Sequence, residues 1–194
     1  MRFLYLVLGA LTAGLITGKA FSPDFGNLYE LMLYTLIFFI GIDLGMSSME
    51  GIKRVGRFVL LLPLSTMLGS LLGGVLASLI LGISLRWGLA IAAGCGWYSL
   101  TGPLIAQYSA VYGALGFLAN LTREIMTVIL YPLAAGKMQK EPLVSIGGAT
   151  TMDTTLPIIR KFGDSETAVV AFVHGFILTA TIPFIIPLIL QILP

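Results

Sequence analysis

The chain has 194 residues, of which 57% are hydrophobic and only 10% are charged, and its formal net charge is +2. Soluble domains carry about 25% charged residues, so this composition excludes a soluble globular protein. The small net charge gives no basis for nucleic-acid binding. At roughly 20 residues per crossing helix, the length predicts about six to eight crossing or re-entrant segments in one transmembrane domain, residues 1–194.

Six apolar stretches follow one another along the chain. The first, 3–21, carries Lys19 where a signal peptide has small cleavage-site residues, so we expect a retained helix. The others cover 28–45, 58–82, 87–108, 114–135 and 167–193. The pattern predicts an all-α polytopic membrane protein with about six transmembrane helices.

Two segments are interrupted by glycine and proline. Residues 140–161 are too polar for a lipid-facing span, which favours a broken or re-entrant element. Residues 94–103, within the fourth stretch, combine three glycines with a terminal proline and favour an unwound turn. Paired interruptions of this kind are typical of transporters, so we predict two discontinuous helices that meet near the membrane midplane.

The fifth stretch carries polar side chains at helical spacing. Asn120, Glu124, Thr127 and Tyr131 share one face, and Arg123 lies on its flank. Ionisable groups inside a membrane are costly and are functional candidates. A buried structural network and direct substrate contact both fit this stripe.

Further acids lie in or near the apolar segments. Asp153 is centred in the interrupted segment 140–161, where a carboxylate needs a cationic ligand or a proton as its counter-charge. Thr150 and Thr154 are candidate polar contacts in the same segment. Asp43 lies near the end of the second stretch, where a site residue and an interfacial residue are both possible.

The pattern favours a carrier for an amino acid, which has one anionic and one cationic end. Its ammonium group would bind near Asp153, and its carboxylate on freed amides with Ser99, Thr101 and Asn120. Tyr98 belongs to the same turn. We expect no metal or other cofactor, because the chain has a single cysteine and a single histidine.

His174 lies in the last stretch and has two interpretations. Its ordinary pKa near 6.5 suits proton coupling, but a lone buried histidine is often a hydrogen-bonded core residue. An alternative function is an intramembrane serine protease with Ser99 as nucleophile and His174 as base. A Gly-x-Ser-Gly string is missing around Ser99, and a dyad gives no role to the charged residues of the other segments.

Four strings together resemble the LysO-type lysine exporter family of prokaryotic inner membranes. They are Gly-Trp-Tyr-Ser-Leu-Thr-Gly at 96–102, Asn-Leu-Thr-Arg-Glu at 120–124, Gly-Gly-Ala-Thr-Thr-Met-Asp-Thr-Thr-Leu-Pro at 147–157 and His-Gly-Phe-Ile at 174–177. The resemblance implies export of L-lysine, and of analogues such as thialysine, by exchange with protons. It also implies that the acid of the Met-Asp string, here Asp153, is important.

The chain departs from the family pattern in two ways. Longer bacterial members carry extra N-terminal helices before the region that matches Met1, so the resemblance implies that two short chains can pair as a homodimer. The family position of Asp43 tolerates uncharged residues, which argues against a universal role for that acid.

Overall fold

The computed structural model describes residues 2–21, 35, 42 and 58–193. Its two compact parts, Met1–Gly41 and Ile42–Pro194, are described separately. In the first part, helix α1 covers Arg2–Phe21, which confirms the helix expected over 3–21. Asp43 and nearly all of the expected span 28–45 lie outside the described residues.

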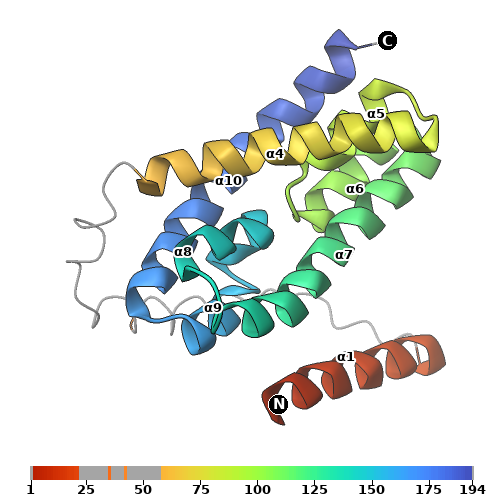
Figure 1. The fold of residues 1–194 in the computed structure, drawn as a ribbon. Coiled ribbons are helices and arrows are strands. Elements are labelled where there is room, and N and C mark those ends of the chain that lie inside the picture. Colours follow the sequence, from red (N-terminus) through yellow and green to blue (C-terminus); the bar gives the residue numbers. More distant parts are fainter. Residues whose placement is uncertain (1, 22–34, 36–41, 43–57, 194) are drawn as a thin grey trace. The chain divides into compact units, whose positions relative to one another are not determined.

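The second part is built from helices joined by short turns (Figure 1). Within residues 58–193 there is no β-strand, so the all-α prediction is confirmed for this part of the chain. The elements are α4 (Phe58–Leu81), α5 (Leu85–Ala93), α6 (Tyr98–Ala106), α7 (Ala110–Ala134), α8 (Lys140–Leu143), the 3-10 turns η1 (Val144–Ile146) and η2 (Gly148–Met152), α9 (Leu156–Phe162) and α10 (Ser165–Ile192).

Three of the described helices are long and apolar enough to cross a membrane. They cover Leu60–Leu81, Ala110–Ala134 and Ser165–Ile192. Helices α5 and α6 have nine residues each, and a helix of that length extends only about 14 Å. Neither alone spans a hydrocarbon core of about 30 Å. The expected fourth span is therefore divided, and the total of about six spans stays a prediction.

Both expected interruptions are present. Helix α5 ends at Ala93 and α6 begins at Tyr98, while residues 140–161 are split among α8, η1, η2 and α9. The backbone explains these breaks, because φ is positive at Cys95, Gly96 and Gly148, with values of 43°, 96° and 64°. A right-handed helix cannot continue through such a residue. Both stretches are thus interrupted where the sequence predicts, while their membership of discontinuous or re-entrant spans that meet near the midplane stays a prediction.

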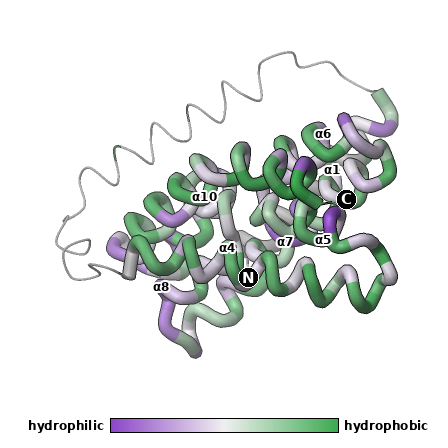
Figure 2. The backbone as a smooth tube through the Cα atoms, turned by 90° about the horizontal axis from the view of Figure 1, so that it is seen from above, coloured by the Kyte–Doolittle hydropathy of each residue, from purple (hydrophilic) through white to green (hydrophobic). Residues whose placement is uncertain are grey.

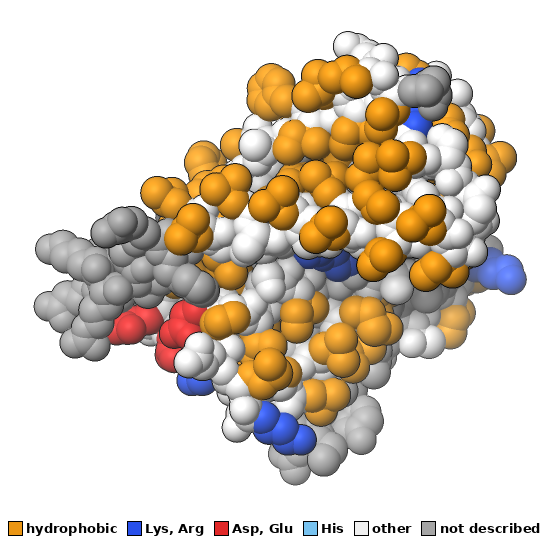
Figure 3. Space-filling view, turned by 45° about the horizontal axis from the view of Figure 1, so that its top comes forward, with side chains coloured by type: hydrophobic (Ala, Val, Ile, Leu, Met, Phe, Trp, Pro, Cys, Tyr) orange, Lys and Arg blue, Asp and Glu red, His pale blue; other side chains and the backbone are white. Residues whose placement is uncertain are grey.

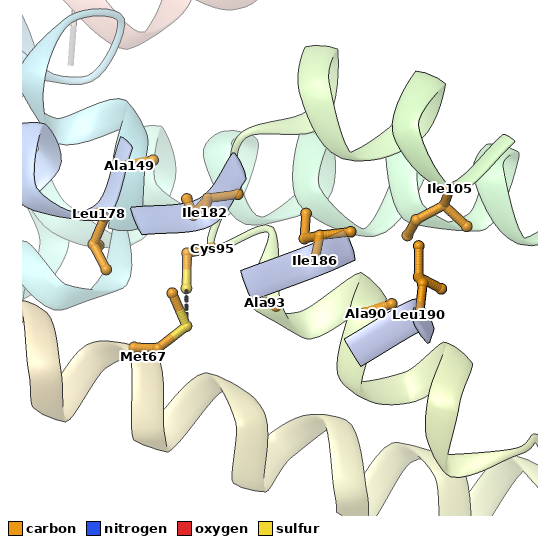
Figure 4. Close-up of a cluster of buried hydrophobic side chains, with 10 residues drawn as sticks. All are labelled: Met67, Ala90, Ala93, Cys95, Ile105, Ala149, Leu178, Ile182, Ile186 and Leu190. Carbon is orange, nitrogen blue, oxygen red and sulfur yellow. Dashed lines mark hydrogen bonds between the residues drawn. The ribbon is translucent and has the colours of Figure 1, made fainter. Parts of the chain in front are cut away.

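A hydrophobic core holds α10 against the interrupted segments (Figure 4). Ile182, Ile186 and Leu190 recur every four residues, so they share one face of α10. Each is at most 2% exposed. The cluster consists of Met67, Ala90, Ala93, Cys95, Ile105, Ala149, Leu178, Ile182, Ile186 and Leu190. Because it draws on η2 and on the turn after α5, this core fixes the position of both breaks.

The outer surface of the second part is apolar, as a lipid-facing surface requires. Hydrophobic residues follow the helices along most of their length (Figure 2) and cover much of the face shown in Figure 3. On α4, Leu64, Leu68, Leu72 and Leu79 are each at least 60% exposed. Such exposed leucines are unfavourable in water and favourable in lipid.

Close packing of α4 on α5 depends on Gly74. A Cβ atom added there would lie 2.6 Å from the Gly88 carbonyl oxygen, so the two helix backbones touch. Gly69, Gly73 and Ala77 are small residues at four-residue spacing on the same helix, but they do not share this contact. A Cβ atom at Gly69 or Gly73 would meet no described atom within 4 Å. Successive residues of an α-helix point about 100° apart around its axis, so Gly74 faces α5 whereas Gly73 does not.

Candidate functional site

The two interrupted segments meet at a backbone crossing. The Ala149 N–H donates to the Cys95 carbonyl oxygen at 2.8 Å. A Cβ atom at Gly148 would clash with that same carbonyl, and one at Gly96 would lie 2.9 Å from the Gly147 carbonyl oxygen. Glycine is therefore required on both sides of the contact, since a side chain on either segment would push the two backbones apart.

Asn120 of α7 holds the first break in place. Its Oδ1 atom accepts a hydrogen bond from the Gly96 N–H at 2.6 Å. Its Nδ2 atom donates to the carbonyls of Ile91 and Gly116, at 3.0 and 2.9 Å. Asn120 is 4% exposed. Both ends of the amide are thus committed to the protein, and Asn120 serves here as a structural support for the break.

Arg123, one turn further along α7, holds the second break. Its Nε and Nη2 atoms donate to the carbonyls of Ile146 and Ser145, both at 2.9 Å. Its Nη1 atom donates to Ser70 Oγ of α4 at 3.1 Å. The guanidinium therefore compensates carbonyl groups that the end of η1 leaves without helical partners.

Glu124 of α7 and Asp153, which directly follows η2, form a pair of acids. The Glu124 carboxyl neighbours the hydroxyls of Thr154 and Tyr98 and interacts electrostatically with the Asp153 carboxyl. Asp153 Oδ1 accepts from the Thr154 N–H at 2.5 Å. Neither acid has a basic group within ion-pair distance among the residues that the structure describes.

Two atoms in this acidic pair region lack partners. Glu124 Oε2 and Thr154 Oγ1 are buried, and neither makes a hydrogen bond with any residue in the described part of the chain. A buried polar atom without a partner costs about 1–3 kcal/mol. A proton, an ammonium group or an ordered water would satisfy these atoms.

His174 of α10 links two other elements. Its Nε2 atom lies 2.9 Å from Thr66 Oγ1 on α4, and its Nδ1 atom lies 3.0 Å from Thr151 Oγ1 on η2. The ring is fully buried. Because both ring nitrogens face threonine hydroxyls and the Ser99 side chain is exposed, the structure does not form the Ser99–His174 dyad that a serine protease needs.

The remaining candidate hydroxyls contact the breaks themselves. Thr101 Oγ1 donates to the Trp97 carbonyl at 2.7 Å, across the start of α6. Thr150 Oγ1 donates to the Gly147 carbonyl at 2.9 Å and lies 3.3 Å from Thr155 Oγ1. These contacts stabilise the turns, so the structure brings Thr101 and Thr150 to the crossing but not to the acidic pair.

Sequence reasoning did not single out Thr66, Ser70, Ser145 or Thr151. Thr66 and Ser70 are hydroxyl residues inside the apolar stretch 58–82, a signal that marks polar contacts between helices. Their partners come from other segments, which spacing alone does not identify. Among the described residues, no three His, Cys, Asp or Glu side chains group as metal ligands.

Asp164 lies just before the spanning helix α10 and caps its N-terminus. Asp164 Oδ1 accepts from the Thr167 N–H and from Thr167 Oγ1, both at 2.8 Å. Lys140 Nζ lies 3.2 Å from Asp164 Oδ2. Partial burial alone would raise the pKa of Asp164, but the hydrogen bonds from Thr167 and Lys140 outweigh it and hold the pKa below its ordinary value.

Comparisons with known proteins agree on one family. The family model described as lysine exporter LysO matches residues 7–190. A protein named lysine exporter LysO from Escherichia coli (strain K12) is 33% identical over 176 residues, which cover 88% of this chain and 58% of that protein. A putative lysine exporter from Haemophilus influenzae is 32% identical over 184 residues, or 93% of this chain and 92% of that protein. No solved structure matches the chain.

Proposed function

Because the chain belongs to the lysine exporter LysO family, we propose that it exports L-lysine, and analogues such as thialysine, across the inner membrane in exchange for protons. It acts as a multi-pass transporter and not as an enzyme. The chain spans 58% of the length of the Escherichia coli relative. The homodimer expected from the family resemblance stays a prediction.

The acidic pair carries this proposal. Glu124 and Asp153 lie close enough to interact electrostatically, and Glu124 Oε2 is buried without a hydrogen-bond partner among the described residues. Two neighbouring carboxylates that lack a basic partner attract a cation. The ammonium group of lysine and a proton are both suitable, and they compete for the same oxygens.

This competition supplies the coupling. When lysine binds, its ammonium group takes the carboxylate oxygens and the acids stay deprotonated. When a proton arrives, it neutralises the same oxygens and weakens cation binding, so lysine leaves. One shared site thus exchanges lysine for protons without a second coupling site. Tyr98 and Thr154, next to Glu124, supply hydroxyls for the bound ammonium group or for water.

The backbone crossing gives the site its rigidity. Asn120 and Arg123, on α7, hold the first and second breaks, and Glu124 follows directly on the same helix. A displacement of either broken segment relative to α7 therefore changes the surroundings of the acidic pair. We propose that such a displacement alternates access to the acidic pair between the two sides of the membrane.

The test is proton movement driven by lysine. Purified protein in liposomes with an internal pH-sensitive dye is given lysine outside, with inside and outside initially at equal pH. We expect lysine entry to make the interior more alkaline in the wild type and not in Asp153→Asn. Asp164→Asn, at the N-cap of α10 and without an electrostatic interaction with either acid, is the matched control and keeps the signal. Lysine movement with no pH change would contradict proton exchange.

A further inference from the structure

A polar pocket lies beside Arg123, and neither Glu124 nor Asp153 is among its lining residues. It has a volume of about 320 Å³ and lies between α4, α7 and η1. Its lining combines one guanidinium with four hydroxyl groups, from Ser65, Thr66, Gly69, Ser70, Arg123 and Ser145. No acid lines it. In Figure 3, basic side-chain atoms are visible in a recess below a band of hydrophobic side chains.

Arg123 has hydrogen-bonding capacity left over in this pocket. A guanidinium carries five N–H donors, and three of them reach Ile146, Ser145 and Ser70. Each terminal nitrogen carries a second N–H, for which the neighbouring Cys95 thiol is only a weak acceptor. No carboxylate of the described residues lies within ion-pair distance of Arg123. Within the described part of the chain, the positive charge therefore has no anionic partner.

The serine hydroxyl groups that line the pocket can also donate hydrogen bonds to an anion. Ser65 Oγ donates to the Leu62 carbonyl, Ser145 Oγ to the Pro142 carbonyl and Ser70 Oγ to the Ala92 carbonyl. Each hydroxyl can rotate toward a ligand, because those carbonyls also belong to helical turns. A planar carboxylate matches the paired donors of a guanidinium better than other small anions do.

From this arrangement we infer that the Arg123 pocket binds the carboxylate group of the exported amino acid. The inference rests on the proposed function and deepens it. Arg123 and Glu124 are adjacent on α7 and point about 100° apart. One flank of the helix thus offers a positive site and the other a negative site. This charge separation matches the two ends of lysine.

The carboxylate location differs from that expected from the sequence. Asn120 and Thr101 donate their hydrogen bonds to backbone carbonyls, so they have little capacity for a ligand. Of Arg123, Asn120 and Thr101, only Arg123 is positively charged and lines the polar pocket. It also clamps η1, and a purely structural role would weaken binding of every ligand equally.

The experiment compares two ligands that differ in the carboxylate. Competition against radiolabelled L-lysine, with purified protein in detergent, gives affinities for lysine and for 1,5-diaminopentane, which is lysine without its carboxylate. We expect the wild type to prefer lysine about 10- to 100-fold, the contribution of hydrogen bonds to a charged group. In Arg123→Gln the preference falls toward one, because lysine binding weakens while diamine binding does not.

Control variants keep the test decisive. Thr122→Ala, an exposed neighbour on α7, retains the wild-type preference. If Arg123→Gln does not fold, Ser70→Ala removes a hydroxyl that lines the pocket and accepts from Arg123, and the preference is expected to fall severalfold.

Three results would overturn the inference. In the first, the preference is unchanged in Arg123→Gln, or in Ser70→Ala where that variant replaces it. In the second, the wild type binds lysine and 1,5-diaminopentane equally well. This result is also expected if a chloride ion, and not the carboxylate of lysine, occupies the pocket. In the third, the wild type does not bind lysine, which contradicts the proposed function as well.

Discussion

The side-chain oxygen of Asn120 lies 2.6 Å from the backbone nitrogen of Gly96 and accepts its N–H. This contact joins the middle of α7 to the break between α5 and α6. It satisfies an amide that a continuous helix would have bonded to its own carbonyls. The break therefore depends on a side chain more than twenty residues away in sequence.

Asn120→Ala is expected to destabilise the protein. The substitution leaves the Gly96 N–H and the Ile91 carbonyl without their side-chain partner, at a cost of about 1–3 kcal/mol for a buried group. Thermal unfolding in detergent measures the effect as a lower midpoint. Thr122→Ala removes only a hydroxyl that donates to the Leu118 carbonyl on the exposed face. It should stay within about 0.5 kcal/mol of the wild type, and equal midpoints for the two variants would contradict the role given to Asn120.

Gly148→Ala is expected to disrupt the crossing. Gly148 has a φ of 64°, and a Cβ atom there would clash with the Cys95 carbonyl oxygen. Backbone strain of this kind costs about 1–3 kcal/mol before the clash is counted. Yield of monodisperse protein and the unfolding midpoint should both fall. Gly69→Ala is the matched control, since its Cβ atom meets no described atom within 4 Å. A Gly148→Ala protein as stable as this control would contradict the close contact of the two segments.

Glu124→Gln is expected to separate stability from transport. The wild-type carboxylate has a buried oxygen without a hydrogen-bond partner in the described residues, and a neutral amide of the same shape is less costly to bury. The unfolding midpoint should stay equal or rise, while lysine binding weakens at least about tenfold. Glu166→Gln, an exposed acid in the first turn of α10, should change neither quantity. Parallel losses of stability and binding in Glu124→Gln would indicate a structural role instead.

Asp164→Ala is expected to show a pH-dependent loss of stability. Loss of an N-cap costs about 1 kcal/mol at neutral pH. The pKa of Asp164 is lower in the folded protein than in the unfolded chain. Its stabilisation is therefore complete above the unfolded pKa of about 3.9 and is lost as pH falls through the folded pKa. Unfolding midpoints of wild type and Asp164→Ala should differ at pH 7 and converge in strong acid. A difference that grows on acidification would contradict this assignment.

Several features of the fold follow from local sequence patterns. The helical spacing of Asn120 and Glu124 places them on one face of α7, since a 3.6-residue period needs no knowledge of neighbouring elements. The breaks at 94–97 and within 140–161 follow from glycine and proline, which interrupt helices wherever they pack.

Other features depend on which elements pack together. The sequence did not predict that Gly74, instead of Gly73, contacts α5, because a rotation of one residue decides which face meets the neighbour. Ser70 and Ser145 come to Arg123 from α4 and η1, and no periodicity relates those three positions. The sequence predicts that Ser99, Thr101 and Asn120 contact the carboxylate of the substrate. Only the three-dimensional structure shows that two of them, Thr101 and Asn120, donate to backbone carbonyls.

The central claim is that this chain carries lysine through a site centred on the acidic pair. Counterflow tests it most directly: liposomes loaded with unlabelled lysine take up radiolabelled lysine when a carrier exchanges the two. We predict uptake by the wild type and its loss in Asp153→Asn at equal incorporation, with Asp164→Asn unchanged. Uptake by Asp153→Asn equal to the wild type, or no uptake above empty liposomes by folded wild-type protein, would contradict the claim.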